Sequence, residues 1–180
     1  MIRRSTDSDR DAIRDIHISA FGKAQGKEIV ELVNGLLGDE TAKPLLSLVV
    51  EINGKIVGHI LFTRARLQPE YQDVSVRILA PLAVSRELQG KGLGGSLIME
   101  GLKQLAQSGV GLVFVLGHPG YYPKYEFRPA GVLGFEAPYP IPSVHADAWM
   151  VQELKPGVIG NVQGTIQCAE VLDEPQHWRE

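Results

Sequence analysis

A glycine-rich turn is the part of this sequence with the clearest chemical use. Gly90, Gly92, Gly94 and Gly95 lie close together between an expected strand and an expected helix. Glycine lets the backbone approach a ligand without interference from a Cβ atom. The N–H groups that begin a helix point outward, and the helix dipole favours an anion beside them. The turn therefore predicts a binding site for a phosphate or a pyrophosphate.

The same segment, Gly90 to Gly95, also satisfies the G-x-G-x-x-G pattern of dinucleotide-binding enzymes. That pattern expects an Asp or Glu about 20 residues further on, at the end of the second strand of a βαβ unit. Here the second strand ends at Leu116 and is followed by Gly117-His118-Pro119, with no acid. A P-loop is excluded because the turn contains no Gly-Lys-Ser or Gly-Lys-Thr. A dinucleotide-dependent oxidoreductase is therefore the less favoured alternative.

The elements before the turn are expected to be mostly antiparallel. Two apolar runs, 45–52 and 55–64, are separated only by Asn53-Gly54, a connector that favours a two-residue hairpin. A third strand is expected over 74–84. Pro81 inside that strand predicts a bulge, because proline cannot donate a hydrogen bond to the ladder.

The elements after the turn predict a βαβ unit. Apolar residues at helical spacing indicate a helix from Leu93 to Ala106, ended by Gly109. The following run, 110–116, is almost purely apolar, which is typical of a buried strand. Further elements are a strand over 2–4, a helix after a capping box at Thr6–Asp9, a second helix ending at Gly38, and late strands over 148–154 and 165–172. The chain is thus expected to form a mixed α/β sheet with helices on both faces.

The residues of the turn resemble the GCN5-related N-acetyltransferases (GNAT). The pyrophosphate motif of that family is Gln or Arg, two residues, Gly, one residue, then Gly or Ala, and Gln89 to Gly94 fits it in full. Residues Tyr121 to Phe127 are similar to the family's aromatic-Tyr-x-x-x-Gly-Phe motif, with Glu126 in the place of the glycine. The stretch 116–130 looks most like the YhbS-type branch of predicted acetyltransferases.

This resemblance implies one GNAT domain over 1–180, with core motifs in 1–135 and a Pro-containing loop and strands in 136–180. It implies a mixed, mostly antiparallel sheet whose fourth and fifth strands splay apart to admit acetyl-CoA as the acetyl donor. Unpaired backbone groups of the splayed strand would bind the pantetheine arm. The implied cofactor-binding residues are Leu82, Ala83, Val84, Gln89, Gly90, Lys91, Gly92, Leu93, Gly94 and Gly95.

The implied reaction is direct acetyl transfer to an acceptor, usually an amine. By resemblance Tyr122 protonates the departing CoA thiolate, and Tyr121 is the alternative acid. An unperturbed tyrosine has a pKa of about 10 and stays protonated at neutral pH. His118, which follows the buried strand, could bond the cofactor, relay a proton or cap the strand. The general base is open between His59, which a core position would also explain, Glu28 or Glu31 of the second helix, which a solvated surface would also explain, and an ordered water.

The composition of the chain limits the kinds of partner and the cellular location that can be expected. The formal net charge is −3 and the sequence has no basic block, which argues against a nucleic-acid partner. No apolar run approaches the roughly 20 residues that a membrane span needs. There is one cysteine, Cys168, and the N-terminus has no apolar targeting segment, so a cytoplasmic protein is expected. Arg64, Arg66 and Arg77 could come together locally, although scattered arginines more often form a solvated surface.

Other chemistries find no support in the sequence. The five histidines are dispersed and lack metal-ligand spacing, so no metal site is expected. No G-x-S-x-G elbow is present, so a covalent acetyl-enzyme is not expected. A non-catalytic acyl-CoA-binding or sensor protein on the same fold is the alternative function, because a fold does not establish an activity. The acceptor class is left open as a small-molecule or peptide amine, as is a homodimer.

Overall fold

A computed structural model describes residues 1–179 of the chain. Its strands are β1 (Ile2–Arg4), β2 (Leu46–Ile52), β3 (Lys55–Gln68), β4 (Val76–Val84), β5 (Leu112–Leu116), β6 (Arg128–Pro129), β7 (Phe135–Glu136), β8 (Trp149–Glu153) and β9 (Gly164–Gln167). Its α-helices are α1 (Arg10–Phe21), α2 (Lys23–Leu37) and α3 (Leu93–Gln107). Short 3₁₀ turns connect several of these elements, including one over Tyr122–Tyr125.

Over residues 1–179 the strands form a nine-stranded sheet with the order β1-β2-β3-β4-β5-β8-β6, extended by β9 on β3 and β7 on β9. Strands β1 to β4 are antiparallel neighbours, and the β4–β5 pair is parallel. Strand β8 pairs with the whole length of β5, so the segment after residue 135 contributes to the same sheet. The expected mixed, mostly antiparallel GNAT-type sheet is confirmed.

The predicted hairpin and bulge are both present. Asn53 and Gly54 have φ angles of 51° and 76°, the positive values that a two-residue turn requires. On the next pair of strands, Ile60 lies opposite Leu82 while Phe62 lies opposite Leu79. Ala80 and Pro81 therefore face a single residue of β3, and the bulge expected from Pro81 is confirmed.

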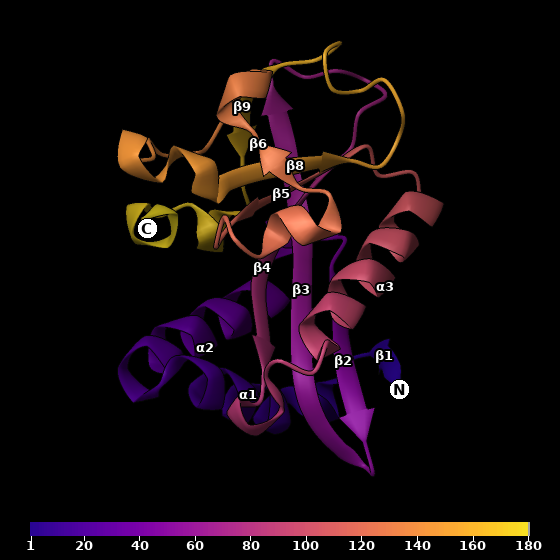
Figure 1. Cartoon of the computed structure of the whole chain (residues 1–180), viewed down its shortest axis with the longest axis vertical. Coiled ribbons are helices and arrows are strands. Elements are labelled where there is room, and N and C mark those ends of the chain that lie inside the picture. Colours follow the sequence, from indigo (N-terminus) through magenta and orange to yellow (C-terminus); the bar gives the residue numbers. More distant parts are fainter. Residues whose placement is uncertain (180) are drawn as a thin grey trace.

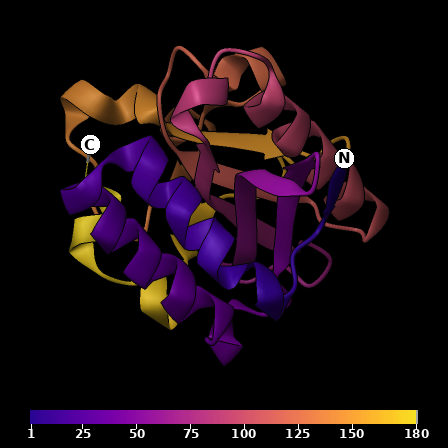
Figure 2. The same ribbon diagram turned by 90° about the horizontal axis from the view of Figure 1, so that it is seen from below.

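Helices cover both faces of the sheet, as the alternating apolar pattern predicts. On one face α1 and α2 bury Ile13, Ile16 and Val33 against strand residues that include Ala83. On the other face α3 buries Leu97 and Ile98 against β2, β3 and β4. Figure 2 shows α1 and α2 on one side of the strands and α3 on the other.

Strands β4 and β5 separate after a short parallel contact. Their pairing covers only Val76 to Ile78 of β4, where Ile78 lies opposite Phe114. Within residues 1–179 the rest of β4 has no strand partner on its β5 side. It continues toward α1 (Figure 1), while β5 stays paired with β8. The expected splay of the fourth and fifth strands is therefore present.

The prediction of a late strand over 165–172 is wrong for the second half of that segment. Strand β9 ends at Gln167, and Glu170–Leu172 forms a 3₁₀ turn. The cause is a tertiary contact, because the N–H of Glu170 donates to the hydroxyl of Thr41 and that of Val171 donates to the carboxylate of Asp39. These side chains of the α2–β2 connection replace the bonds of a strand ladder. Conversely, β3 extends to Gln68, beyond the predicted end at residue 64, because Arg66 to Gln68 pair with β9.

Candidate functional site

The glycine turn (residues 89–95) joins the end of β4 to the start of α3. Gly90 and Gly92 have φ angles of 79° and 85°, in the left-handed region that favours glycine. A Cβ atom at either position would meet no other atom within 4 Å, so the backbone here faces open space. Helix α3 begins at Leu93, and its first N–H groups have no partner within the helix. The turn therefore presents backbone donors to a ligand, as the sequence predicts.

Gln89 fixes the entry to this turn. Its side-chain amide donates to the carbonyl of Val84 at 3.0 Å, across the short loop between strand and helix. The last residue of β4 and the first residue of the turn are thereby held together. Gln89 thus has a structural contact that explains a polar side chain at this position.

A cavity of about 440 Å³ opens between the turn, the unpaired end of β4 and the C-terminal end of α1. Its wall includes eight of the predicted cofactor-binding residues: Leu82, Ala83, Val84, Gln89, Gly90, Gly92, Leu93 and Gly94. The remaining lining residues are Ala20, Phe21, Leu88, Tyr121, Lys124 and Tyr125. Lys91 and Gly95 belong to the same turn but are outside this wall, with Lys91 exposed and Gly95 buried beneath the ring of Tyr125.

Two tyrosines face the turn across the cavity. The hydroxyl of Tyr121 lies beside Gly94, and burial together with its hydrogen bond to Tyr125 raises the pKa of Tyr121 to about 12. The ammonium group of Lys124 lies 5.5 Å from the centroid of the Tyr121 ring. Tyr121 was only the alternative acid in the sequence, and Phe21, Lys124 and Tyr125 were not predicted at all. The aromatic spacing of residues 121–127 was the signal that could have indicated Tyr125.

Tyr122 lies on the opposite side of the splay, at the end of β5. Its ring packs so closely on Gly117 that a Cβ atom there would be 2.9 Å from Cδ2 of Tyr122. The same ring makes edge contacts with Tyr121 and Phe127, at centroid distances of 5.1 and 5.7 Å. Tyr122 is buried and is not part of the cavity wall, but its ring packs on Gly117, the residue that directly follows β5. Its role as the acid stays a prediction.

The histidines occupy different environments. His118 is exposed, and its Nδ1 accepts a hydrogen bond from the N–H of Gly120 at 3.0 Å, which closes a turn after β5. His59 is fully buried under α1, with Nδ1 2.9 Å from Nε2 of His17 and Nε2 2.8 Å from the hydroxyl of Ser47. The interpretation of His59 as a hydrogen-bonded core histidine is confirmed. A catalytic role of His118 is not tested by this contact.

Two structural features are absent from residues 1–179. In that part of the chain no three His, Cys, Asp or Glu side chains are grouped closely enough to hold a metal ion. Over the same residues, no helix has the length and apolar character needed to cross a membrane.

Comparison with known proteins gives close matches over nearly the whole chain. Residues 1–130 match the family described as "Acetyltransferase (GNAT) domain". The chain is 48% identical over 164 residues to the protein named Uncharacterized N-acetyltransferase YjhQ of Escherichia coli (strain K12), covering 91% of this chain and 88% of that protein. It is 26% identical to Uncharacterized N-acetyltransferase YhbS of the same strain, covering 94% and 87%.

Solved structures give the same pattern. The YhbS structure from Escherichia coli, described as a GNAT family N-acetyltransferase in complex with CoA, superposes with a TM-score of 0.84 over 97% of this chain and 92% of that chain. A GNAT family acetyltransferase from Brucella melitensis, in complex with acetyl-CoA, is 28% identical with a TM-score of 0.74, covering 96% and 97%.

Proposed function

The chain belongs to the GNAT acetyltransferase family, and from this premise we propose that it transfers the acetyl group of acetyl-CoA to an amine acceptor. One observation supports this function above the others. The unpaired end of β4 and the glycine turn before α3 line the same cavity. An extended amide-containing arm that ends in a pyrophosphate is the ligand that these two features would bind together.

In this proposal the backbone of Leu82, Ala83 and Val84 pairs with the pantetheine arm as a missing strand would. These residues lie beyond Ile78, where the pairing between β4 and β5 ends. The pyrophosphate then lies on the N–H groups of the glycine turn, where the α3 dipole and the exposed Lys91 add positive charge. An N–H near Val84, on the side of β4 that faces away from β3, would stabilise the oxyanion that forms on the thioester carbonyl.

Tyr122 is the proposed acid for the CoA thiolate. The support is its place against Gly117, directly after β5 and therefore beside the gap that the arm would occupy. Tyr122 holds its proton at neutral pH because a phenol has a pKa of about 10, so the proton is available to the thiolate as the C–S bond breaks. A free thiol has a pKa of about 8.5, so the phenolate left behind is the stronger base and takes up a proton again after the transfer. The acceptor amine attacks the carbonyl carbon, the C–S bond breaks, and the thiolate takes the Tyr122 proton and departs as the thiol. The proton lost by the acceptor nitrogen passes to solvent and restores Tyr122.

The acceptor, the role of His118, and the location and oligomeric state of the protein are parts of the proposal that do not depend on these contacts. The acceptor is a small-molecule or peptide amine of unassigned identity. His118 is retained as a candidate that positions the cofactor or relays a proton. A cytoplasmic location and a homodimer stay predictions from the sequence.

Isothermal titration of the purified chain with acetyl-CoA, CoA and NADH tests the central claim. We expect micromolar binding of acetyl-CoA and its loss in the double variant Gly92→Asp, Gly94→Asp, which places carboxylates where the pyrophosphate should lie. Binding of NADH in preference to acetyl-CoA would overturn the proposal. A panel of amines followed by thiol release separates catalysis from binding alone, since a sensor would bind acetyl-CoA and release no CoA with any of them.

A further inference from the structure

Three arginines come together at the end of β4 that is remote from the glycine turn. Arg64 of β3 and Arg77 of β4 are direct cross-strand partners, and Arg66 follows Arg64 on the same face of β3. We refer to these residues as the arginine cluster. Together with the loop that connects β3 to β4, they line a cavity of about 330 Å³.

The positive charge of this cluster is not neutralised by the chain. Among residues 1–179, none of the ion pairs includes Arg64, Arg66 or Arg77. Glu70 is the acid in the cavity wall, and it forms no ion pair with the arginines in that described part. The guanidinium of Arg77 donates to a backbone carbonyl, that of Val76, at 2.9 Å. The cavity thus has an excess of positive charge.

The arrangement is unfavourable without a counterion. Like charges directly opposite each other on a sheet destabilise the pair. Arg77 is half-buried, and this burial, together with the charge of Arg64, lowers the pKa of Arg77. A bound anion would remove the repulsion and provide acceptors for the guanidinium donors.

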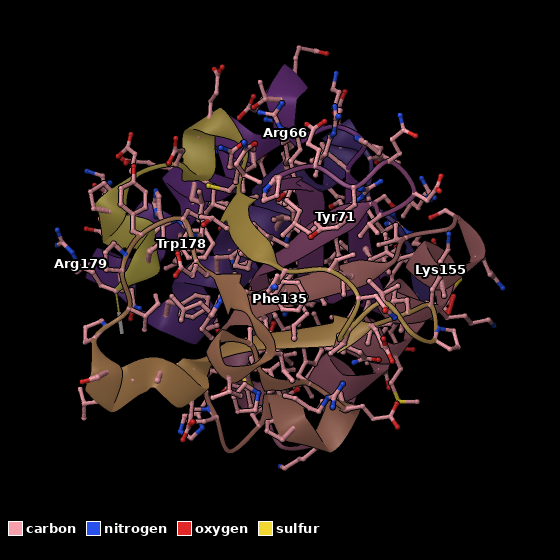
Figure 3. All side chains as sticks on the ribbon, turned by 90° about the horizontal axis from the view of Figure 1, so that it is seen from above. Arg66, Tyr71, Phe135, Lys155, Trp178 and Arg179 are labelled. Atoms are coloured by element: carbon pink, nitrogen blue, oxygen red, sulfur yellow. The ribbon has the colours of Figure 1, made fainter. Side chains whose placement is uncertain are left out.

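The surroundings favour a small oxyanion. Two guanidinium groups on adjacent strands offer forked donor pairs, the geometry that binds phosphate oxygens. Tyr71 and Ser75 also line the cavity, and the hydroxyl of Ser75 donates to the carbonyl of Gly109 at 3.4 Å. The side chains of Arg66, Tyr71 and Lys155 are visible on the same end of the molecule (Figure 3), with Lys155 beside Gly109 and outside the cavity wall.

We propose that the arginine cluster is a second anion site, which binds the doubly charged phosphate group of inorganic phosphate or of a small phosphate monoester. The site is separate from the cofactor cavity, because Arg77 is near the start of β4 and Val84 is at its end. Seven residues of extended strand separate the two positions by roughly 20 Å. Arg77 immediately precedes Ile78, where β4 and β5 part, so the occupied site would brace the base of the splay.

Amide chemical shifts of the full chain locate the binding. Inorganic phosphate, methyl phosphate and succinate are titrated separately at constant ionic strength, with chloride as the balancing ion. We expect saturable shifts in residues 64–77 with inorganic phosphate or with methyl phosphate, and the tighter of the two identifies the source of the group. Shifts confined to the glycine turn, equal shifts with chloride, or tighter binding of succinate would overturn the proposal.

Variants make the assignment specific. The double variant Arg64→Gln, Arg77→Gln should weaken phosphate binding at residues 64–77 by about tenfold or more, whereas Arg128→Gln, an exposed arginine on β6, should leave it unchanged. The Gly92→Asp variant should also leave it unchanged, because the glycine turn is a different site. Thermal unfolding provides an independent measurement. Phosphate should raise the Tm of the wild type and of Arg128→Gln but not that of the double variant, and an equal rise in all three would contradict the inference.

Discussion

The hydroxyl of Tyr121 lies against the backbone of Gly94, so that a Cβ atom at position 94 would come within 2.7 Å of it. Gly94→Ala should therefore push the Tyr121 side chain into the cavity beside the glycine turn, where we propose that acetyl-CoA binds. We expect acetyl-CoA binding to weaken by about tenfold, which corresponds to about 1.4 kcal/mol. Titration calorimetry measures this change. The fold should not be weakened, since alanine is a better helix former than glycine.

Matched variants separate this contact from a general effect of a methyl group. Gly131→Ala places its methyl group where no atom lies within 4 Å, so it should bind acetyl-CoA like the wild type. Adding Tyr121→Phe to Gly94→Ala should recover most of the lost affinity, because the clashing oxygen is gone. If Gly94→Ala binds acetyl-CoA normally, Tyr121 is free to move and does not shape the cavity.

The adjacent tyrosines should respond differently to loss of their hydroxyl groups. Tyr122→Phe is expected to lower kcat by about 100-fold, the lower end of what a general acid contributes, with little change in acetyl-CoA affinity. Tyr121→Phe should change affinity more than kcat, because Tyr121 lines the cavity beside the glycine turn. Thiol release and calorimetry on both variants provide the comparison. The reverse pattern would transfer the role of acid to Tyr121.

Helix α3 packs on the sheet through a contact that only glycine permits. A Cβ atom at Gly101 would lie within 2.6 Å of Cζ of Phe62, whose ring is fully buried. Gly101→Ala should lower the free energy of unfolding by about 1–3 kcal/mol, because overpacking outweighs the gain of roughly 1 kcal/mol in helix propensity. Urea unfolding measures the loss. In a Phe62→Leu background the same substitution should cost less, and equal costs in both backgrounds would show that the ring is not the obstacle.

Local sequence signals were sufficient for the elements that build the cavity beside the glycine turn. The Asn53-Gly54 turn, the bulge at Pro81 and the glycine turn each require a particular backbone conformation, which restricts the residues that can occupy it. The splay of β4 and β5 was expected from family resemblance, and the positions of its residues followed from the same motifs. These predictions depend on contacts between residues that are close in the chain.

The parts that could not be predicted depend on contacts between distant residues. The turn at 170–172 replaces a strand because Asp39 and Thr41 bind its N–H groups, and no pattern in that segment indicates this. Phe21 reaches the cavity only because α1 ends beside β4, a packing result that periodicity does not reveal. The sequence allowed Arg64, Arg66 and Arg77 to come together, but the direct pairing of Arg64 with Arg77 depends on the register of β3 against β4, which the bulge shifts.

The buried histidine pair predicts an unusual dependence of stability on pH. Burial lowers the pKa of His17 from 6.5 to about 4 and that of His59 to about 3. Between pH 6.5 and about 4, both rings are therefore neutral in the folded protein, whereas the same two histidines are protonated in the unfolded chain. The contribution of these two neutral histidines to the free energy of unfolding is fully present above pH 6.5 and is lost as the pH falls from 6.5 toward 4. For His17 the full shift corresponds to about 3 kcal/mol.

Chemical denaturation at a series of pH values tests this prediction. The range from pH 6.5 to 4 is informative because Asp9, whose pKa the Arg3 guanidinium lowers from 3.8 to about 2, loses most of its contribution to stability below that range. The variant His17→Leu, His59→Leu removes both titrating groups, so its unfolding free energy should change much less between pH 6.5 and 4, whatever its absolute value. His145→Gln, which alters a histidine outside this core, should keep the slope of the wild type. A leucine double variant with an undiminished slope would show that other groups cause the pH dependence and that the neutral histidine pair does not.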